Sequence, residues 1–218
     1  MLYKYLPPER LDVLSHRRIR FTSPVSLNDP FEYRLKIGEH EYAIQPDVAK
    51  SETKFISLSR NHTNLLMWSH YANSHKGIVV GFSRSHPYFQ NAKPVRYRRL
   101  RSVLNGVNLA TFEPAEITKV ILIEKALDWA YEEEERLFID DVDNNSIIAG
   151  LDEWEQEISL NKFPESAIKS VYLGLRVSSD IKKKVIGILN TYQEKISLYR
   201  AKVSKDEYGI KFTEVEYT

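Results

Sequence analysis

The chain is built from short stretches in which hydrophobic residues alternate with polar ones or recur at helical spacing. Alternation over residues 2–6 and again over residues 18–22 predicts two strands. Between them, Leu11 and Leu14 lie three positions apart, which predicts a short helix over residues 9–16. The further predicted elements are strands over 54–59, 77–82, 93–99 and 168–175, helices over 64–72, 112–128 and 179–192, and a hairpin over 197–215.

Strands and helices follow one another without an internal repeat or a clear linker. Residues 33–50 are polar and mixed, which predicts a loop or a weak helix. Residues 140–163 are rich in Asp and Asn, which predicts an insertion or an exposed segment. We therefore predict one α+β domain over residues 1–218, with a mixed, mainly antiparallel sheet and flanking helices.

Composition places the chain among folded globular proteins, because 42% of its residues are hydrophobic and 28% are charged. A net charge of +1 gives no overall attraction to nucleic acid or to an anionic membrane. The absence of cysteine excludes disulfides, thiolate metal sites and a cysteine nucleophile. No apolar run is long enough for a signal peptide or a membrane span, so we expect a cytoplasmic protein without membrane contact.

Four consecutive glutamates, between aromatic residues and an apolar triplet, mark the segment 129–139. If this segment is a strand, Glu132, Glu134 and Arg136 share one face, and Arg136 pairs with a glutamate and keeps it ionised. If it is a helix, the glutamates form a solvated face. The first arrangement brings carboxylates to the edge of a pocket, whereas the second leaves them in water.

A local basic cluster contains Arg96, Arg98 and Arg99, with Tyr97 between the first two. On a strand, Arg96 and Arg98 face one way and Tyr97 faces the other. This pattern is typical of a solvated edge strand and also of a surface that contacts nucleic acid phosphates. The chain has no Walker A loop, no GxGxxG, no GxSxG and no HExxH motif.

Several short phrases together resemble a widespread bacterial family of unknown function, which occurs as small stand-alone proteins. The resemblance spans roughly residues 2–175. Its phrases are LYKY at 2–5, IRFTSP at 19–24, LNDPFE at 27–32, SLS at 57–59, MWSHYA at 67–72, HKG at 75–77, GF at 81–82, WAYEEEER at 129–136 and VYLG at 171–174.

The order of these phrases is also similar to that of ADP-ribosyltransferases. That superfamily carries a basic residue on an early strand, a Ser-x-Ser element on a middle strand and a glutamate on a late strand. The chain offers Lys4 or Arg20, then Ser57-Leu58-Ser59, then Glu132-x-Glu134. It departs from the pattern at Lys4, because the early basic residue of the superfamily is usually Arg or His.

The resemblance implies an enzyme that uses NAD as a substrate. Glu134, or else Glu132, would stabilise positive charge on the ribose, and His70 is a candidate acid–base group. A cation would hold the pyrophosphate, a serine would place the ribose, and an aromatic ring would stack on nicotinamide. The candidate NAD-binding residues are Lys4, Arg20, Ser57, Ser59 and Tyr71.

We therefore predict an ADP-ribosyltransferase-like enzyme, of the kind that serves as a bacterial toxin or a phage-defence effector. One alternative is a metal-dependent nuclease that uses Asp29, Glu32, Glu132, Glu134 and His70. Another is a non-catalytic module that binds nucleic acid or protein through Arg96, Arg98 and Arg99. For the LNDPFE segment, a structural turn and a loop that walls a pocket are both consistent with the sequence.

Overall fold

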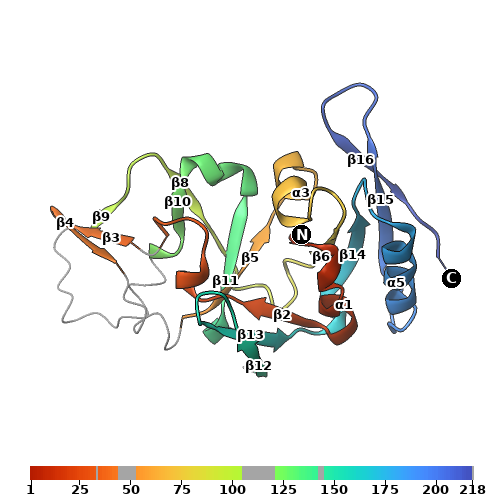
Figure 1. Ribbon diagram of the computed structural model, residues 1–218, viewed down its shortest axis with the longest axis horizontal. Coiled ribbons are helices and arrows are strands. Elements are labelled where there is room, and N and C mark those ends of the chain that lie inside the picture. The colour runs from red at the N-terminus through yellow and green to blue at the C-terminus, as the bar shows by residue number, and fades with distance from the viewer. Residues whose placement is uncertain (33, 44–52, 105–120, 142–144, 218) are drawn as a thin grey trace.

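The computed structural model describes residues 1–32, 34–43, 53–104, 121–141 and 145–217. Its main element is an eight-stranded sheet in the order β16-β15-β14-β6-β1-β5-β11-β7. All neighbouring strands in this sheet are antiparallel except β14 and β15, which are parallel. The architecture is therefore α+β with a mixed, mainly antiparallel sheet, as predicted (Figure 1).

Short helices alternate with strands along the chain. The α-helices are α1 (Asp12–His16), α3 (Leu65–Tyr71) and α5 (Ser179–Leu189). The strands of the main sheet are β1 (Leu2–Leu6), β5 (Phe55–Ser59), β6 (Ile78–Phe82), β7 (Lys93–Pro94), β11 (Glu134–Phe138), β14 (Ile168–Leu173), β15 (Ser197–Val203) and β16 (Ile210–Glu214). The smaller sheets contain β2 (Arg18–Phe21), β3 (Arg34–Ile37), β4 (His40–Ala43), β8 (Arg96–Arg98), β9 (Val103–Leu104), β10 (Glu124–Ala126), β12 (Ser146–Leu151) and β13 (Glu157–Lys162). The 3-10 helices are η1 (Pro8–Arg10), η2 (Pro24–Ser26), η3 (Leu127–Glu132), η4 (Ile139–Asp141) and η5 (Glu165–Ala167).

The two faces of the main sheet carry different side chains, because neighbouring residues of a strand point to opposite sides. One face packs Leu2, Leu6, Ile56 and Leu58 against helices α1 and α5 and forms the larger hydrophobic core. The opposite face carries an aromatic cluster around helix α3. That second face also holds Ser57, Ser59, Glu134 and Arg136, whereas Lys4 leaves β1 on the same side as Leu2 and Leu6.

Strands β1 and β5 are joined along only a short part of their length. Their ladder contains one residue pair, Tyr3 with Ser59, although each strand has five residues. By contrast, β1 pairs with β6 from Leu2 to Leu6. The two central strands therefore separate beyond Tyr3, which leaves backbone groups and space between them.

Most elements predicted from periodicity are confirmed. The strands at 2–6, 18–22, 54–59, 77–82 and 168–175 and the helices near 9–16, 64–72 and 179–192 are present with bounds shifted by a few residues. Asn64 caps α3 by accepting hydrogen bonds from two backbone amides, and Ser178 caps α5 in the same way with one. The C-terminal hairpin is present as β15 and β16.

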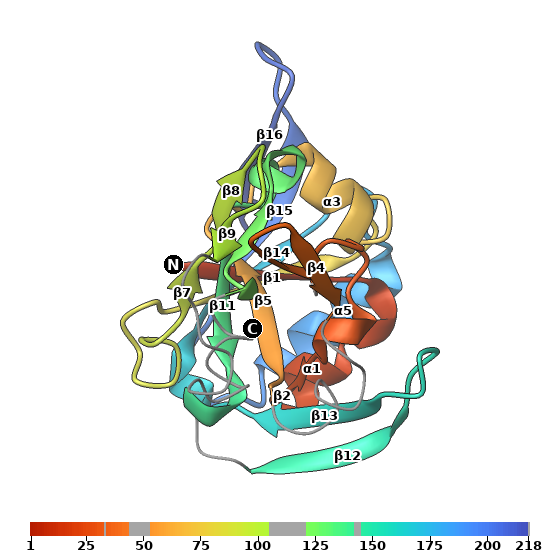
Figure 2. The same ribbon diagram turned by 90° about the vertical axis from the view of Figure 1, so that its left-hand side faces the viewer.

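Four predictions of secondary structure need correction. Residues 34–43 form the hairpin β3–β4. The predicted helix over 112–128 is confirmed only at residue 121; the described residues that follow form a turn, β10 and the start of η3, and residues 112–120 lie outside the described residues. The strand over 93–99 is interrupted at the buried Val95, so β7 joins the main sheet and β8 pairs with β10. The stretch from 145 to 162, predicted as an insertion or an exposed segment, is exposed over much of its length but forms β12 and β13, and β13 pairs with β2 (Figure 2).

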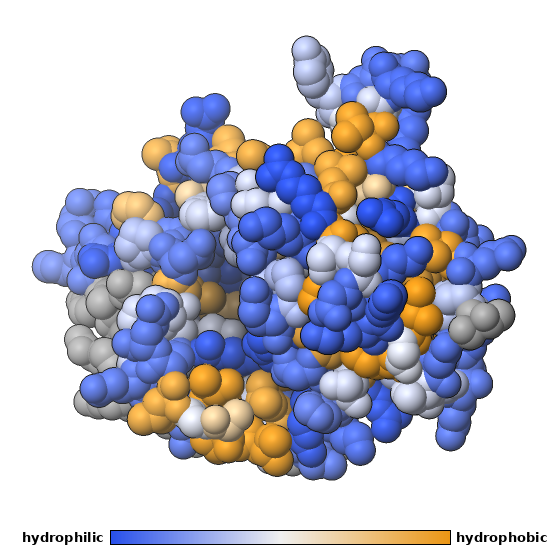
Figure 3. Space-filling view, turned by 45° about the vertical axis from the view of Figure 1, so that its right-hand side comes forward, coloured by the Kyte–Doolittle hydropathy of each residue, from blue (hydrophilic) through white to orange (hydrophobic). Residues whose placement is uncertain are grey.

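The hairpin β12–β13 carries exposed apolar side chains, namely those of Ile147, Ile148 and Leu151. Figure 3 shows a hydrophobic patch at the lower edge of the molecule, where this hairpin lies in Figure 1. Among the described residues, no helix has both the length and the apolar character that crossing a membrane requires.

Candidate active site

A cavity of about 320 Å³ opens on the face of the main sheet that carries helix α3. It lies where β1, β5 and β11 are neighbours, and the segment 26–32 and helix α3 close its sides. The lining residues are Tyr3, Lys4, Tyr5, Ser26, Leu27, Asn28, Glu32, Ser57, Leu58, Ser59, Met67, Tyr71, Lys125, Glu132, Glu134 and Arg136. Its volume is at the lower end of the range for small-molecule sites.

The acidic run reaches this cavity through a change of backbone conformation at Glu133. The 3-10 helix η3 ends at Glu132, Glu133 takes a left-handed conformation with φ of 46°, and β11 begins at Glu134. Alternation along β11 then turns Glu134 and Arg136 toward the cavity, whereas Glu135 faces the opposite side and pairs with Arg84. Neither alternative for this segment is fully correct. Residues 127–132 form a 3-10 helix and not a strand, and the glutamates do not form a solvated face, because Glu132 is 4% exposed and Glu134 3% exposed.

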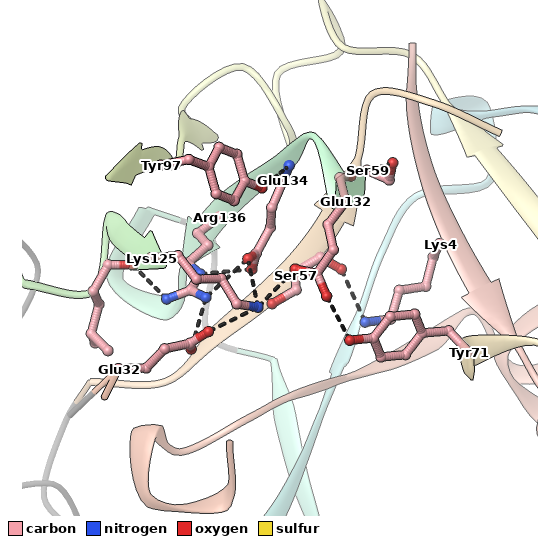
Figure 4. Close-up of polar contacts among 11 residues, drawn as sticks. Lys4, Glu32, Ser57, Ser59, Tyr71, Tyr97, Lys125, Glu132, Glu134 and Arg136 are labelled. Atoms are coloured by element: carbon pink, nitrogen blue, oxygen red, sulfur yellow. Dashed lines mark hydrogen bonds and ion pairs between the residues drawn. The ribbon is translucent and has the colours of Figure 1, made fainter. Parts of the chain in front are cut away.

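Arg136 is the centre of the charged groups in the cavity (Figure 4). It is 0% exposed and binds Glu134 through one edge of the guanidinium, with Nε 2.6 Å from Oε1 and Nη2 2.9 Å from Oε2. Nη2 also lies 2.9 Å from an oxygen of Glu32, and Nη1 donates to the carbonyl of Leu122 at 2.6 Å. The expected pairing of Arg136 with a glutamate is therefore present, in a fixed bidentate geometry.

Lys125 is the second cation, and it bridges three carboxylates. Its Nζ lies 2.8 Å from Glu32, 2.7 Å from Glu132 and 3.6 Å from Glu134. The same ammonium stands 4.7 Å from the centre of the Trp129 ring, within range of a cation–π contact. Lys125, Arg136 and the three glutamates form one buried group of charges, which we call the charge cluster.

Opposite charges favour the ionised forms of Glu134 and Lys125 although burial opposes ionisation. Burial alone would raise the pKa of Glu134, but the charge and hydrogen bonds of Arg136 outweigh it and lower that pKa to about 2. Burial would lower the pKa of Lys125, and the three carboxylates around it raise it instead. Glu32 differs, because burial dominates over both cations and raises its pKa. Because its pKa is far below 7, Glu134 carries a negative charge at neutral pH.

Lys4 is a third cation at the cavity, and it is held differently. Its Nζ donates to the backbone carbonyl of Ser57 at 3.0 Å, in the space where β1 and β5 separate. Among the described residues, no carboxylate lies within 4.0 Å of this ammonium. Burial lowers the pKa of Lys4 to about 8, and the more distant Glu134 opposes that shift. Lys4 is therefore a cation without a paired anion at the cavity wall.

The hydroxyl groups around the cavity orient the acidic residues. Tyr71 donates from its hydroxyl to Glu132 at 2.6 Å, and Ser59 donates to the backbone carbonyl of Glu132 at 2.7 Å. The hydrogen bond of Ser57 to Glu134 helps to lower the pKa of that glutamate. On the other side of the cluster, the Tyr97 hydroxyl accepts a hydrogen bond from the amide of Glu134 at 2.8 Å.

The structure brings together most of the residues predicted for the site. The cavity is lined by Lys4, Ser57, Ser59, Tyr71, Glu132 and Glu134. His70 and Arg20 are not among its lining residues. His70 is exposed on α3, with its ring near Tyr71 and Tyr131. Arg20 lies on β2 and pairs with Asp152.

Two residues of the cluster were not predicted to act in an NAD site. Lys125 fell inside a predicted helix, and its neighbours in sequence carry no pattern that marks it. Glu32 was predicted only as a metal ligand, while its LNDPFE segment was predicted to turn or to wall a pocket. Both roles occur there: Asp29 accepts from the amide of Phe31 at 2.9 Å, and Asn28 and Glu32 line the cavity.

The carboxylates expected for a metal site are arranged around protein cations. Glu32, Glu132 and Glu134 lie close together, but Lys125 and Arg136 occupy the positions between them. In the part of the chain that the structure describes, no group of three or more His, Asp or Glu side chains is suited to hold a metal ion.

The comparison with protein families gives a match over residues 67–137, a segment that runs from helix α3 into β11. It contains Tyr71, Lys125, Glu132, Glu134 and Arg136, whereas Lys4 and Ser57 lie outside it. No curated protein and no solved structure matches the chain. The predicted resemblance to an uncharacterised family is confirmed for this segment: residues 67–137 match the family described as "Protein of unknown function (DUF2971)".

Proposed function

We propose that the cavity binds NAD and that the protein is an ADP-ribosyltransferase-like enzyme. The observation that carries this proposal is the meeting of three neighbouring strands at one cavity. Lys4 comes from β1, Ser57 from β5 and Glu134 from β11, and these strands follow one another in the sheet. They are the cation, the hydroxyl and the carboxylate that the resemblance to ADP-ribosyltransferases assigns to binding and catalysis.

The chemistry fits the charges of the cavity. In the reaction, the bond between C1′ of the ribose and nicotinamide breaks, and its electron pair leaves with nicotinamide. Positive charge develops on the ribose, and an acceptor forms the new bond to C1′ with its own electron pair. A carboxylate that is already ionised and fixed stabilises this transition state without having to reorient. Glu134 meets both conditions, because Arg136 orients it and holds its pKa low.

Glu132 is the second carboxylate in reach of the ribose. One of its oxygens accepts from Tyr71 at 2.6 Å and the other from Lys125 at 2.7 Å. Its carboxylate therefore lies between Tyr71 and Lys125 (Figure 4). We assign Glu134 to charge stabilisation and Glu132 to the ribose hydroxyls and to the proton that the acceptor releases.

Lys4 is suited to hold a phosphate. An ammonium whose protein partner is a neutral carbonyl has most of its charge available to a ligand, and a phosphate oxygen forms a charge-assisted hydrogen bond with it. The ring of Tyr71 lines the cavity and offers an apolar surface for nicotinamide. The cavity accommodates the nicotinamide ribose end of NAD, and the remainder of the dinucleotide extends through its mouth.

The test is release of nicotinamide from NAD, measured by chromatography, by the wild type and by Glu134→Gln and Glu132→Gln. Glu135→Gln is the matched control, because Glu135 is on the same strand but faces the opposite side of the sheet. We expect a loss of about 100-fold or more for the first two variants and a rate near the wild type for the control. Circular dichroism of each variant establishes that the fold is retained.

Absence of nicotinamide release from the wild type, in the presence of cell lysate to supply acceptors, would contradict the proposal. Equal rates for all three variants would also contradict it, because the cleavage would then not depend on the cavity.

A further inference from the structure

A second cavity of about 590 Å³ adjoins the candidate active site. It is lined by strands β8 and β10, by the segment 99–103 and by residues 29, 31, 32 and 34. Glu32 and Lys125 line both cavities, so the two share a wall. We call this second cavity the arginine groove, because its lining includes Arg34, Arg96, Arg98, Arg99 and Arg101.

The arginine groove offers positive charge that the protein itself uses only in part. Arg98 pairs with Glu124 at 3.1 Å and Arg101 pairs with Glu41 at 3.1 Å. Arg96 and Arg99 are exposed, and among the described residues no carboxylate lies within 4.0 Å of either. The charge cluster differs, because each of its cations has carboxylate partners. Two guanidinium groups of the groove are therefore available to an anion from outside.

Exposed apolar side chains are interleaved with these arginines. Phe31 is 56% exposed and Leu100 is 84% exposed, and both line the groove. The guanidinium carbon of Arg101 stands 6.0 Å from the centre of the Phe31 ring. A ring in this setting is a platform on which a flat group can stack. An isolated inorganic phosphate would use the arginines but would make no use of Phe31 and Leu100.

A single nucleic acid strand has both kinds of partner. Its phosphates pair with guanidinium groups, and its unpaired bases stack on aromatic side chains. In a duplex the bases are already stacked on one another, so Phe31 would have no base to bind. An acidic peptide would use the arginines and has no regular series of flat rings. The combination of free arginines and an exposed ring therefore favours a single strand.

Phe31 lies next in sequence to Glu32, a residue that lines both the arginine groove and the candidate active site. Phe31 precedes Glu32, and Glu32 is bound to Lys125 at 2.8 Å and to Arg136 at 2.9 Å. A base that stacks on Phe31 therefore lies at the wall that separates the groove from the NAD cavity. We propose that the arginine groove binds single-stranded nucleic acid and presents a base as the acceptor of ADP-ribose. This inference rests on the proposed function for the transfer step but not for the binding step.

The transfer step balances with these groups alone. The base supplies an N–H or O–H group, whose heavy atom bonds to C1′ of the ribose with its own electron pair. Nicotinamide departs with the electrons of the broken bond, and the proton of the acceptor passes to a carboxylate of the charge cluster and then to solvent. No oxidant, reductant or further reactant is required.

The binding step is tested by fluorescence anisotropy with a labelled 20-nucleotide DNA strand, its duplex and the RNA strand of the same sequence. We expect the wild type to bind at least one single strand more tightly than the duplex. Arg96→Glu/Arg99→Glu should weaken this binding by at least tenfold, because two phosphate contacts become repulsive. Phe31→Ala should weaken it by about tenfold through loss of stacking.

The control is Lys183→Glu/Lys202→Glu, which makes the same change in net charge on α5 and β15. Both lysines are exposed, and neither lines the groove. This variant should bind the strand within about twofold of the wild type. Two results would overturn the inference. One is an equal loss of strand affinity in both double variants. The other is duplex binding as tight as single-strand binding, with no change of affinity in Phe31→Ala.

The transfer step is tested with labelled NAD and the same strand, followed by electrophoresis under denaturing conditions. Label on the strand supports the inference, and nicotinamide release without labelled strand overturns the acceptor assignment while the proposed function stands. The protein could instead bind the strand with the expected dependence on Arg96, Arg99 and Phe31 but release no nicotinamide under any condition. That result would support the binding step and contradict the proposed function.

Discussion

The charge cluster and the arginine groove are neighbours that share Glu32 and Lys125, but they differ in whether their cations have carboxylate partners. In the cluster, Arg136 is fully buried and each cation is matched by carboxylates. In the groove, Arg96 and Arg99 are exposed and have no carboxylate partner among the described residues. The difference fits the two functions that we propose. A buried, paired cluster can hold a fixed geometry, whereas exposed arginines without a carboxylate partner among the described residues can bind an external anion.

The sharpest way to break this comparison is to remove one arginine from each region. Arg136→Met should lower the free energy of unfolding by about 3–5 kcal/mol, because it leaves Glu32 and Glu134 buried with Lys125 alone. Arg96→Met should change it by less than about 0.5 kcal/mol, as is usual for exposed positions. Urea denaturation measures both. Similar values for the two variants would contradict the assignment of different roles.

Within the cluster, the hydroxyl of Tyr71 provides a smaller test. Tyr71→Phe removes the donor that lies 2.6 Å from Glu132 and leaves the ring in place. We expect a loss of about 1.5–3 kcal/mol in unfolding free energy, which is the usual contribution of a hydrogen bond to a charged group. Tyr208→Phe is the matched control, because Tyr208 is fully exposed, and it should have no measurable effect. An unchanged stability of Tyr71→Phe would show that Glu132 does not depend on this bond.

Lys4 shares a feature with each region: burial shifts its pKa, and among the described residues it has no carboxylate partner. Its pKa of about 8 means that it loses its charge as pH rises from 7 to 9. If only the protonated form holds the pyrophosphate, the affinity for NAD should fall by about tenfold over that range. Calorimetric titration at each pH measures it, and Lys4→Arg should remove the dependence. A flat profile for the wild type would contradict the role of Lys4.

The same shift has a consequence for stability. The ordinary pKa of lysine is 10.5, so between about pH 8 and 10.5 the unfolded chain binds a proton that the folded protein has released. Lys4 therefore opposes folding below about pH 8, and this opposition disappears as pH rises toward 10.5. Lys4→Met should be more stable than the wild type near pH 7, and the difference should vanish above pH 10.5.

The smallest expected effect lies in the groove. Arg98 and Glu124 form an ion pair whose side chains are partly exposed. Arg98→Ala should change the free energy of unfolding by less than about 1 kcal/mol, and added salt should reduce the difference further. Urea denaturation at low and high salt measures this. A larger, salt-independent loss would mean that the groove is a structural element like the cluster.

The same contrast explains which features the sequence predicts. Residues 2–6 alternate between apolar and polar side chains, and residues 77–82 contain a short apolar run with glycines. Both are strands of the main sheet. Ser178 and the apolar positions after it mark helix α5. These signals are local, because a core face repeats along one element. Residues 145–162 lack such a signal. Their strands β12 and β13 pair with each other, and β13 also pairs with β2, which is distant in sequence.

The site was predictable where a residue type and its strand position agree. Ser57 and Ser59 lie on one face of β5, and Glu134 and Arg136 lie on one face of β11. Both pairs line the cavity. Lys125 gave no such signal, because its role depends on a fold that brings β10 beside Glu32 and Glu134. Arg20 and His70 carry suitable chemistry but point elsewhere, which only the tertiary structure decides. A run of charged residues can be solvated or buried, and the sequence alone does not decide between the two.

The most direct test of the central claim is a crystal structure with an NAD analogue whose bond between ribose and nicotinamide cannot be cleaved. Our account predicts that the nicotinamide ribose lies in the cavity lined by Tyr71, Ser57 and Glu134, with a phosphate oxygen within hydrogen-bonding distance of Lys4. An analogue bound elsewhere, or a cavity that stays closed by the charge cluster at saturating analogue, would contradict it.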